Sequence, residues 1–206
     1  ALAAQRSTEP PVLAAHAHGE RVRMPWGALL PLTLGGASLG ILFGATEVAT
    51  VAFADEVSTK AFSGLLLAIW SFGSLLAGAL TGAVTWKIGT LARLRRGAFA
   101  LTLMMTITPF IGVLWLQALV LFGAGFAISP TLIAAVSRLE EVTPRARFSE
   151  AMGLLHTGLA AGTAPGAAFG GLVVDHYGGS AAYWIGVAGA GLALLCGLLA
   201  REPKAD

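Results

Sequence analysis

The sequence contains a single cysteine, Cys196, and few charged residues. One cysteine can supply neither a disulfide framework nor a thiolate metal site, which excludes the small disulfide-rich and zinc-binding classes. Only 12% of the residues are charged, about half the share of an average soluble domain, whereas 56% are apolar. The sequence also lacks a phosphate-binding loop, a metal-ligand cluster and a basic aromatic surface, so we expect no cofactor, no metal and no nucleic-acid partner. This composition indicates a membrane protein.

Long runs without Asp, Glu, Lys or Arg separate the few charges. Five runs each reach the ~20 residues that cross a bilayer as a helix, and the run over 97–137 is long enough for two crossings. We expect its turn within 109–117, where Pro109 and Gly112 interrupt the helix and Gln117 marks contact with water. The predicted fold is an all-α membrane protein with six spans. The spans are 26–52, 61–86, 97–113, 117–137, 150–174 and 181–200.

The basic residues gather on one side of this predicted bundle. With the amino terminus in the cytoplasm, twelve of the thirteen lysines and arginines lie in inner segments and only Lys60 lies in an outer one. The positive-inside rule then places both ends of the chain in the cytoplasm, as in a multi-pass protein of the bacterial inner membrane. Trp26 and Trp86 fall at inner boundaries, and Trp115 and Trp184 at outer ones, as expected for indoles that favour the headgroup layer.

The chain divides into a linker, a bundle and a tail. Residues 1–24 are rich in alanine and proline and read as a cytoplasmic linker, residues 25–200 as the six-span bundle, and residues 201–206 as a cytoplasmic tail. The linker lacks an initiator methionine and a signal-peptide core. We expect a chain that begins in a linker to be the later part of a longer one, although processing could also explain the missing methionine.

Small residues recur every four positions in three of the spans. Such stripes let helix backbones approach closely, and they occur both in static packing and in the moving interfaces of transporters. Pro130 and Pro165 fall within the fourth and fifth spans, where each removes a backbone hydrogen bond and is expected to kink its helix. The stripes comprise Gly36, Gly40 and Gly44; Ser74, Gly78 and Gly82; and Gly158, Gly162, Gly166 and Gly170.

Six spans with both ends inside, a basic linker in front and a basic loop after the second span resemble the C-terminal half of a major facilitator superfamily transporter. After its second span the family carries G-x-x-x-D-R/K-x-G, and "GAVTWKIG" supplies Gly82, Lys87 and Gly89 of this pattern. Trp86 stands where the aspartate would be, and this degraded form favours the second half of the family's fold. The resemblance implies that Lys87 gates the inner face; simple anchoring of the loop is the alternative.

The fifth span, "GLAAGTAPGAAFGG", resembles the glycine- and proline-rich helix of proton-coupled antiporters in the same family, with the order Pro165-Gly166 instead of Gly-Pro. The resemblance implies half of a twelve-helix secondary transporter that moves a small molecule by alternating access, with proton-coupled efflux suggested. Its partners would be a small-molecule substrate, the lipid bilayer and the N-terminal six-helix half. The alternative is a non-transporting six-helix module that binds a partner or homodimerises.

An enzyme is not expected. "GASLG", residues 36–40, matches the G-x-S-x-G of hydrolases, but that motif needs a strand-to-helix turn and here lies within a long apolar helix.

Four side chains within the spans are candidates for substrate or proton binding. Glu47 shares a helix face with Gly40, Phe43 and Thr50, and an ionisable group inside a membrane is a functional candidate. It lies in the outer third of its span, so proton or substrate binding, an outer-gate contact and a structural hydrogen bond all remain open.

The other three candidates are His156, Trp70 and Phe126. His156 could line an inner vestibule or bond a backbone carbonyl. Trp70 lies at mid-depth, where it either packs between helices or faces a cavity.

Overall fold

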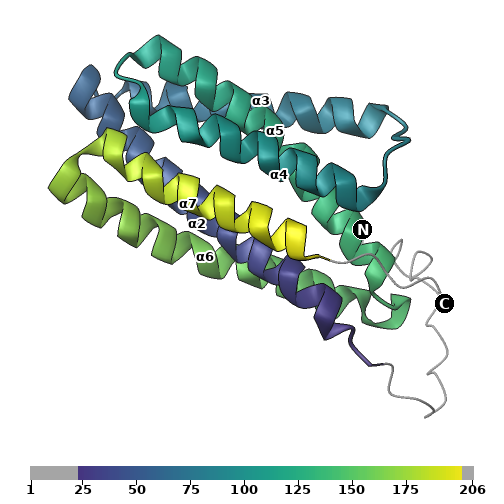
Figure 1. Ribbon diagram of the computed structural model, residues 1–206. Coiled ribbons are helices and arrows are strands. Elements are labelled where there is room, and N and C mark those ends of the chain that lie inside the picture. Colours follow the sequence, from purple (N-terminus) through teal and green to yellow (C-terminus); the bar gives the residue numbers. More distant parts are fainter. Residues whose placement is uncertain (1–22, 201–206) are drawn as a thin grey trace, which may run out of the picture.

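The computed structural model of the chain describes residues 23–200, and all of its regular structure in that range is helical (Figure 1). Two 3₁₀ turns, η1 (Thr108–Phe110) and η2 (Arg145–Arg147), lie between longer helices. The long helices are α2 (Trp26–Val57), α3 (Phe62–Ala83), α4 (Thr90–Ile107), α5 (Leu114–Val142), α6 (Phe148–Tyr177) and α7 (Gly179–Leu199). Each of them overlaps one of the six predicted spans, with ends that differ by up to seven residues. The linker residues 1–22 and the tail 201–206 lie outside the described residues.

Five of the six helices are long and apolar enough to cross a membrane; α4 is the exception. Arg93, Arg95 and Arg96 occupy its first two turns, so the apolar part of α4 begins at Gly97 and continues into η1. Most helices extend beyond the predicted spans, because a helix does not end where its apolar run meets the membrane surface. The observed fold is therefore all-helical with at least five membrane-spanning helices.

The turn between α4 and α5 lies within the predicted 109–117, but the expectation that Gln117 contacts water is wrong. Residues 111–113 form the turn and α5 begins at Leu114, so Gln117 already lies in the first turn of a helix. Its side chain is completely buried. The loop between α6 and α7 is also shorter than the sequence indicated: only Gly178 separates the two helices, with a φ of 86° that a residue with a side chain rarely adopts.

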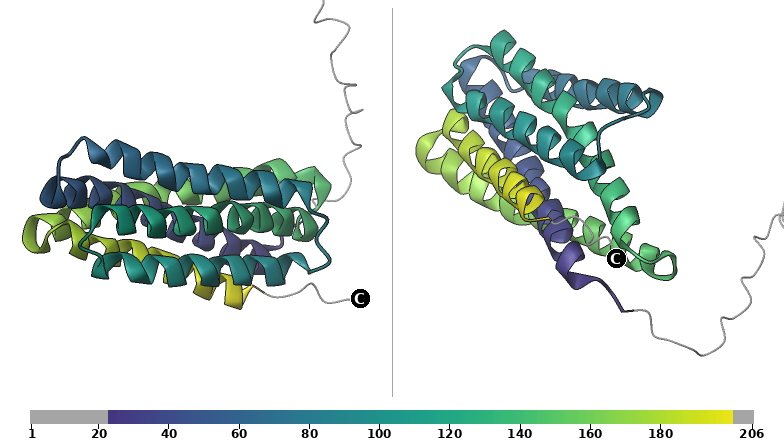
Figure 2. Two further views of the ribbon diagram at one scale, coloured as in Figure 1. Left: turned by 90° about the horizontal axis from the view of Figure 1, so that it is seen from above. Right: turned by 45° about the vertical axis from the view of Figure 1, so that its right-hand side comes forward.

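The helices form two groups of three, and in each group one helix packs between the other two. α2 packs between α6 and α7, whereas α5 packs between α3 and α4; contacts between α4 and α7 join the two groups (Figures 1 and 2). Exchanging α2, α3 and α4 with α5, α6 and α7 reproduces these pairs of neighbours, although the contact between α6 and α7 has no counterpart between α3 and α4. The chain therefore consists of two three-helix repeats of inverted topology, and each group combines helices from both repeats.

Glycines set the closest helix approaches. A Cβ on Gly162 would lie 1.9 Å from the carbonyl oxygen of Ala37, and one on Gly40 would lie 2.1 Å from that of Leu159. The equivalent pair in the other group is Gly125, where a Cβ would lie 2.0 Å from the carbonyl oxygen of Trp70. Gly82, the last member of the second stripe, has no atom of another helix near it. The stripes of small residues on α2 and α6 therefore serve helix packing in this conformation.

Long-range hydrogen bonds join the ends of α4 and α7 to other helices. The Glu56 carboxylate, near the end of α2, accepts a 2.6 Å hydrogen bond from the backbone N–H of Gly179 at the start of α7. In the other repeat Glu141, near the end of α5, accepts a hydrogen bond from Thr90 at the start of α4. Arg95 of α4 donates to the carbonyl oxygens of Gly197, Leu198 and Ala200 at the end of α7.

Candidate functional site

Glu47 lines a cavity of about 580 Å³ between α2, α3 and α6. Its wall combines apolar side chains with three carboxylates and one lysine, which give the cavity a net negative charge. We call it the α2–α3–α6 cavity. Its lining residues are Glu47, Val48, Val51, Ala52, Asp55, Lys60, Leu67, Gly171, Val174 and Asp175.

The Glu47 side chain is exposed, and among residues 23–200 it makes no hydrogen bond or ion pair. A structural hydrogen bond within this half of the molecule therefore does not account for it. Glu47 lies ten residues before the end of α2, or about 15 Å by helical rise, so it sits below the mouth of the cavity. Asp55, Asp175 and Lys60 lie nearer the mouth. Glu47 is thus the deepest charge on the wall.

A stripe of small side chains on α6 leads away from this cavity. The stripe runs at helical spacing from Asp175 and the half-buried Gly171 on the cavity wall to the exposed Ala168, Ala164 and Ala161. Between Phe148 and Ala168, α6 exposes no large apolar side chain. α3, α4 and α7 expose large apolar side chains along their length, as lipid-facing helices do. We call this surface the small-residue face of α6.

His156 lies on α6 toward the opposite end from the cavity. Its side chain is exposed, and Nδ1 lies 2.9 Å from the carbonyl oxygen of Met152 in the preceding turn. This contact matches the backbone-carbonyl interpretation of the sequence. α2 and α6 run parallel, with Gly36 beside Leu155 and Ala45 beside Gly170, so His156 and Glu47 stand at opposite ends of the same helix pair.

Trp70 packs in the core of the bundle. Only 6% of its surface is exposed, and its ring lies 5.7 Å from that of Phe43. Its indole N–H has no hydrogen-bond partner within the described part of the chain. Trp70 lies outside the α2–α3–α6 cavity in this conformation, so its assignment to a substrate site stays a proposal.

Sequence reasoning missed a buried polar cluster where α2, α5 and α7 meet. The Thr50 and Tyr183 hydroxyls share a 2.9 Å hydrogen bond, and both residues are completely buried. The Gln117 amide approaches the Tyr183 hydroxyl, yet neither its nitrogen nor its oxygen makes a hydrogen bond of ordinary geometry in the described range. Threonine, tyrosine and glutamine spaced widely along the chain give no local signal; only their packing brings them together.

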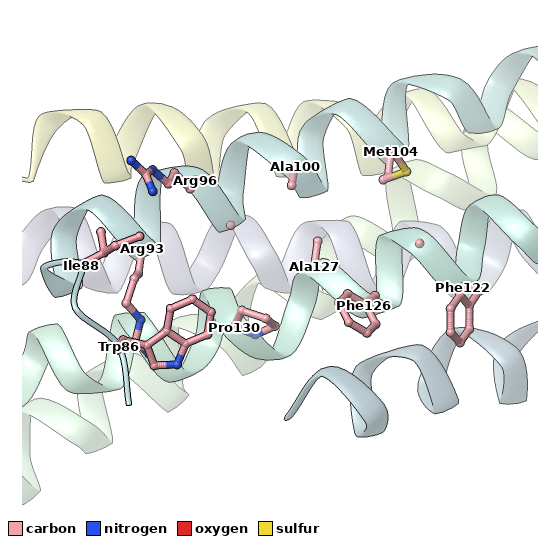
Figure 3. A pocket seen from close by; sticks show the side chains of 12 residues that line it. Trp86, Ile88, Arg93, Arg96, Ala100, Met104, Phe122, Phe126, Ala127 and Pro130 are labelled. Atoms are coloured by element: carbon pink, nitrogen blue, oxygen red, sulfur yellow. The ribbon is translucent and has the colours of Figure 1, made fainter. Parts of the chain in front are cut away.

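Phe126 lines a second cavity, of about 620 Å³, on the other side of the bundle. Figure 3 shows Phe122 and Phe126 of α5 on one side of it and Ala100 and Met104 of α4 on the other. Trp86 and Arg93 stand at its end. We call this cavity the α4–α5 groove. It is separate from the cavity that holds Glu47.

The loop after α3 carries the predicted gating residues. Lys87 and Gly89 are exposed, and Lys87 makes no hydrogen bond or ion pair among the described residues. Trp86 donates from Nε1 to the Thr81 carbonyl oxygen at 3.0 Å. Arg93 lies over the Trp86 ring at 5.0 Å from its centroid, a cation–π contact. Pro130 and Pro165 both lie inside continuous helices.

Groups of three or more metal-binding side chains are absent from the part of the chain that the structure describes. Six long helices in two inverted repeats, with a partly open cavity at one side, are an arrangement typical of secondary transporters. A family model described as Major Facilitator Superfamily matches residues 22–206. The chain belongs to the Major Facilitator Superfamily. No curated protein is similar enough to the chain to count as a match.

Membership of the Major Facilitator Superfamily indicates the general activity of the protein. It is a multi-pass membrane transporter of the major facilitator type, and it acts on a small-molecule substrate. The family consists of transporters. Gly36 and Ser38, from the G-x-S-x-G match, lie within the continuous helix α2.

Proposed function

We propose that this chain is the C-terminal half of a secondary transporter that moves a small molecule across the cytoplasmic membrane by alternating access. The N-terminal half supplies the opposite wall of the transport path. The main support is the α2–α3–α6 cavity. Helices of this chain form the wall on one side of the cavity, and the small-residue face of α6 extends from that wall. A surface of alanine and glycine is suited to contact with another helix, because small side chains let two backbones approach.

The charges of the described residues support one orientation. Eight lysines and arginines lie at one end of the bundle and only Lys60 lies at the other. By the positive-inside rule the basic end faces the cytoplasm, which places the mouth of the α2–α3–α6 cavity outside. In this orientation α4, the third helix in chain order, also spans the membrane, with its three arginines at the inner membrane surface.

We assign Glu47 to proton coupling of efflux. A carboxylate that has no partner among the described residues, deep in a negatively charged cavity, can exchange a proton or a cationic group of the substrate without first breaking an ion pair. The nearby Asp55 and Asp175 raise the local concentration of cations and protons at the mouth.

Cysteine accessibility in the full-length protein tests alternating access without a known substrate. Cys196 and any other cysteine are replaced by alanine, and single reporters are introduced by Val51→Cys in the outer cavity and Thr157→Cys at the inner end of α6. Each reporter should react with a membrane-impermeant maleimide only from its own side. Coupling a bulky maleimide to the outer reporter in the double variant should slow the reaction of the inner one about tenfold, because the two accessible states exclude each other.

Leu103→Cys on the lipid-facing side of α4 is the matched control and should react from neither side. Equal reactivity of the inner reporter, whether or not the outer one is blocked, would contradict alternating access. That result would favour the non-transporting six-helix module.

A further inference from the structure

The α4–α5 groove differs in chemistry from the α2–α3–α6 cavity, and the transport path does not account for it. It is the larger of the two at about 620 Å³, and it contains no carboxylate. Its walls are apolar along α4 and α5, and its only charged residues are Arg93 and Arg96, at one end. A ligand that fits must therefore combine an apolar body with an anionic end.

Small residues create the groove. The short side chains of Ala100 and Ala127 leave the space of the groove. Gly97 and Gly123 also line it but are close contacts, since a Cβ would lie 2.4 Å from Thr131 Oγ1 and 3.1 Å from Met104 Sδ, respectively. α3 and α4 each pack against α5 but have no extensive contact with each other. The groove is therefore open between α3 and α4, toward the outside of the bundle.

The surroundings of the groove face lipid. The outward side of α4 carries Phe99 and Leu103, which are 59% and 50% exposed, and α3 carries Leu75 and Leu80. These large apolar side chains contrast with the small-residue face of α6, which is suited to a helix partner. An acyl chain is the apolar body that this environment supplies.

The length of the groove matches one membrane leaflet. Arg93 and Met104 are eleven residues apart on α4, or about 16 Å by helical rise. Half of the ~30 Å hydrocarbon core is about 15 Å. An acyl chain that starts at the arginines and runs along the groove would thus end near the bilayer centre.

The charged end has the features of a headgroup site. Arg93 and Arg96 lie one helical turn apart on the same face of α4, within reach of one phosphate. The hydrogen bond from Trp86 to Thr81 holds its ring at this end, and Arg93 lies over the ring. Arg96 has no hydrogen bond or ion pair among residues 23–200, whereas its neighbour Arg95 is occupied with the end of α7.

We propose that the α4–α5 groove binds one anionic phospholipid of the inner leaflet. Its phosphate lies between Arg93 and Arg96 and one acyl chain lies along the apolar wall to Met104. In the orientation proposed above, this end of the groove stands at the cytoplasmic headgroup layer, where anionic lipids are attracted to basic pockets between helices.

The test is lipid titration of the full-length, delipidated protein by native mass spectrometry, with phosphatidylglycerol and phosphatidylcholine of the same acyl length. We expect phosphatidylglycerol to bind more tightly. The double variant Arg93→Gln/Arg96→Gln should weaken its binding about thirtyfold, from the loss of two phosphate contacts. Arg145→Gln, an exposed arginine at the same end but outside the groove, is the charge control and should leave binding unchanged.

A second variant separates the headgroup from the acyl chain. Ala100→Phe fills the groove and should weaken binding of both lipids equally, and glycerol phosphate without acyl chains should not displace phosphatidylglycerol. If the double arginine variant keeps full affinity, or if Arg145→Gln loses as much as it does, the specific site is excluded. Displacement by glycerol phosphate would show an anion site without a lipid chain and would also overturn the proposal. Melting temperatures confirm that each variant is folded, and the arginine variants decide the outcome alone if Ala100→Phe is not.

Discussion

At the residue scale, Glu47 and Glu56 show how position decides the role of a carboxylate. They lie nine residues apart on α2, yet Glu56 accepts a hydrogen bond from the Gly179 N–H while Glu47 has no partner among the described residues. A carboxylate at the start of a helix stabilises that helix through the exposed N–H groups. A carboxylate without partners in a cavity contributes nothing comparable to stability and is available for a ligand or proton.

This difference predicts a specific effect of Glu47→Gln. In the full-length reporter protein, the reactivity of Thr157→Cys, measured relative to that of a free thiol at each pH, should depend on pH, because protonation of Glu47 shifts the balance between the two states. Glu47→Gln should abolish that dependence of the relative reactivity. Asp55→Asn, which removes another carboxylate of the same cavity, should preserve it. An unchanged pH profile in Glu47→Gln would remove Glu47 from proton coupling.

The glycines of α6 permit a second prediction at this scale. Gly162→Ala would place a methyl group against the Ala37 carbonyl, and overpacking of this kind costs about 1–3 kcal/mol. Gly153→Ala on the same helix meets no atom of another helix and should be neutral or stabilising by up to about 1 kcal/mol. Thermal unfolding in detergent measures both. Equal melting temperatures for the two variants would show that the α2–α6 contact is looser than the structure has it.

At the scale of the helix, α7 depends on residues that lie far from it in the sequence. Glu56 caps its first turn and Arg95 caps its last, so both ends of a 21-residue helix are closed by other helices. The apolar run of α7 was readable from the sequence. Its caps were not, because local capping signals involve neighbouring residues, whereas these partners are more than 100 positions away.

Removal of these caps should loosen the ends of α7. Glu56→Ala is expected to cost about 0.5–2 kcal/mol and to speed amide exchange in the first turn of α7. Arg95→Ala should do the same in the last turn, where three carbonyl groups lose a donor. Asp55→Ala, next to Glu56 but without a contact to α7 among the described residues, is the control. Hydrogen–deuterium exchange distinguishes the two ends, and uniform exchange along α7 in all variants would refute the capping role.

At the scale of the whole molecule, two kinds of exposed surface divide the bundle. Large apolar side chains cover the outward sides of α3, α4 and α7, whereas the small-residue face of α6 runs beside the α2–α3–α6 cavity. Lipid tails adapt to large side chains, but a second helix needs small ones for close contact. This division supports one side of the bundle as the site of the N-terminal half.

A matched pair of substitutions tests that assignment in the full-length protein. Ala164→Trp on the small-residue face should disturb packing against the other half and lower the melting temperature, with a cost of about 1–3 kcal/mol. Leu195→Trp, at a half-exposed position on α7, should be tolerated because lipid surrounds it. If both variants melt alike, the α6 face does not hold a helix partner.

The sequence by itself determined the helix count, the approximate spans, the basic end and the resemblance to the facilitator family. These features depend on apolar run length and charge placement, which are local properties of the chain. The tertiary structure decided which side chains meet. It buried Gln117 beside Tyr183, set Glu47 in an acidic cavity and placed Phe126 in a separate groove with Arg93. Contacts between helices depend on how each helix is rotated about its axis and on which helices it packs against. An apolar run of any composition is stable in the bilayer, so apolarity alone determines neither the rotation nor the pairing.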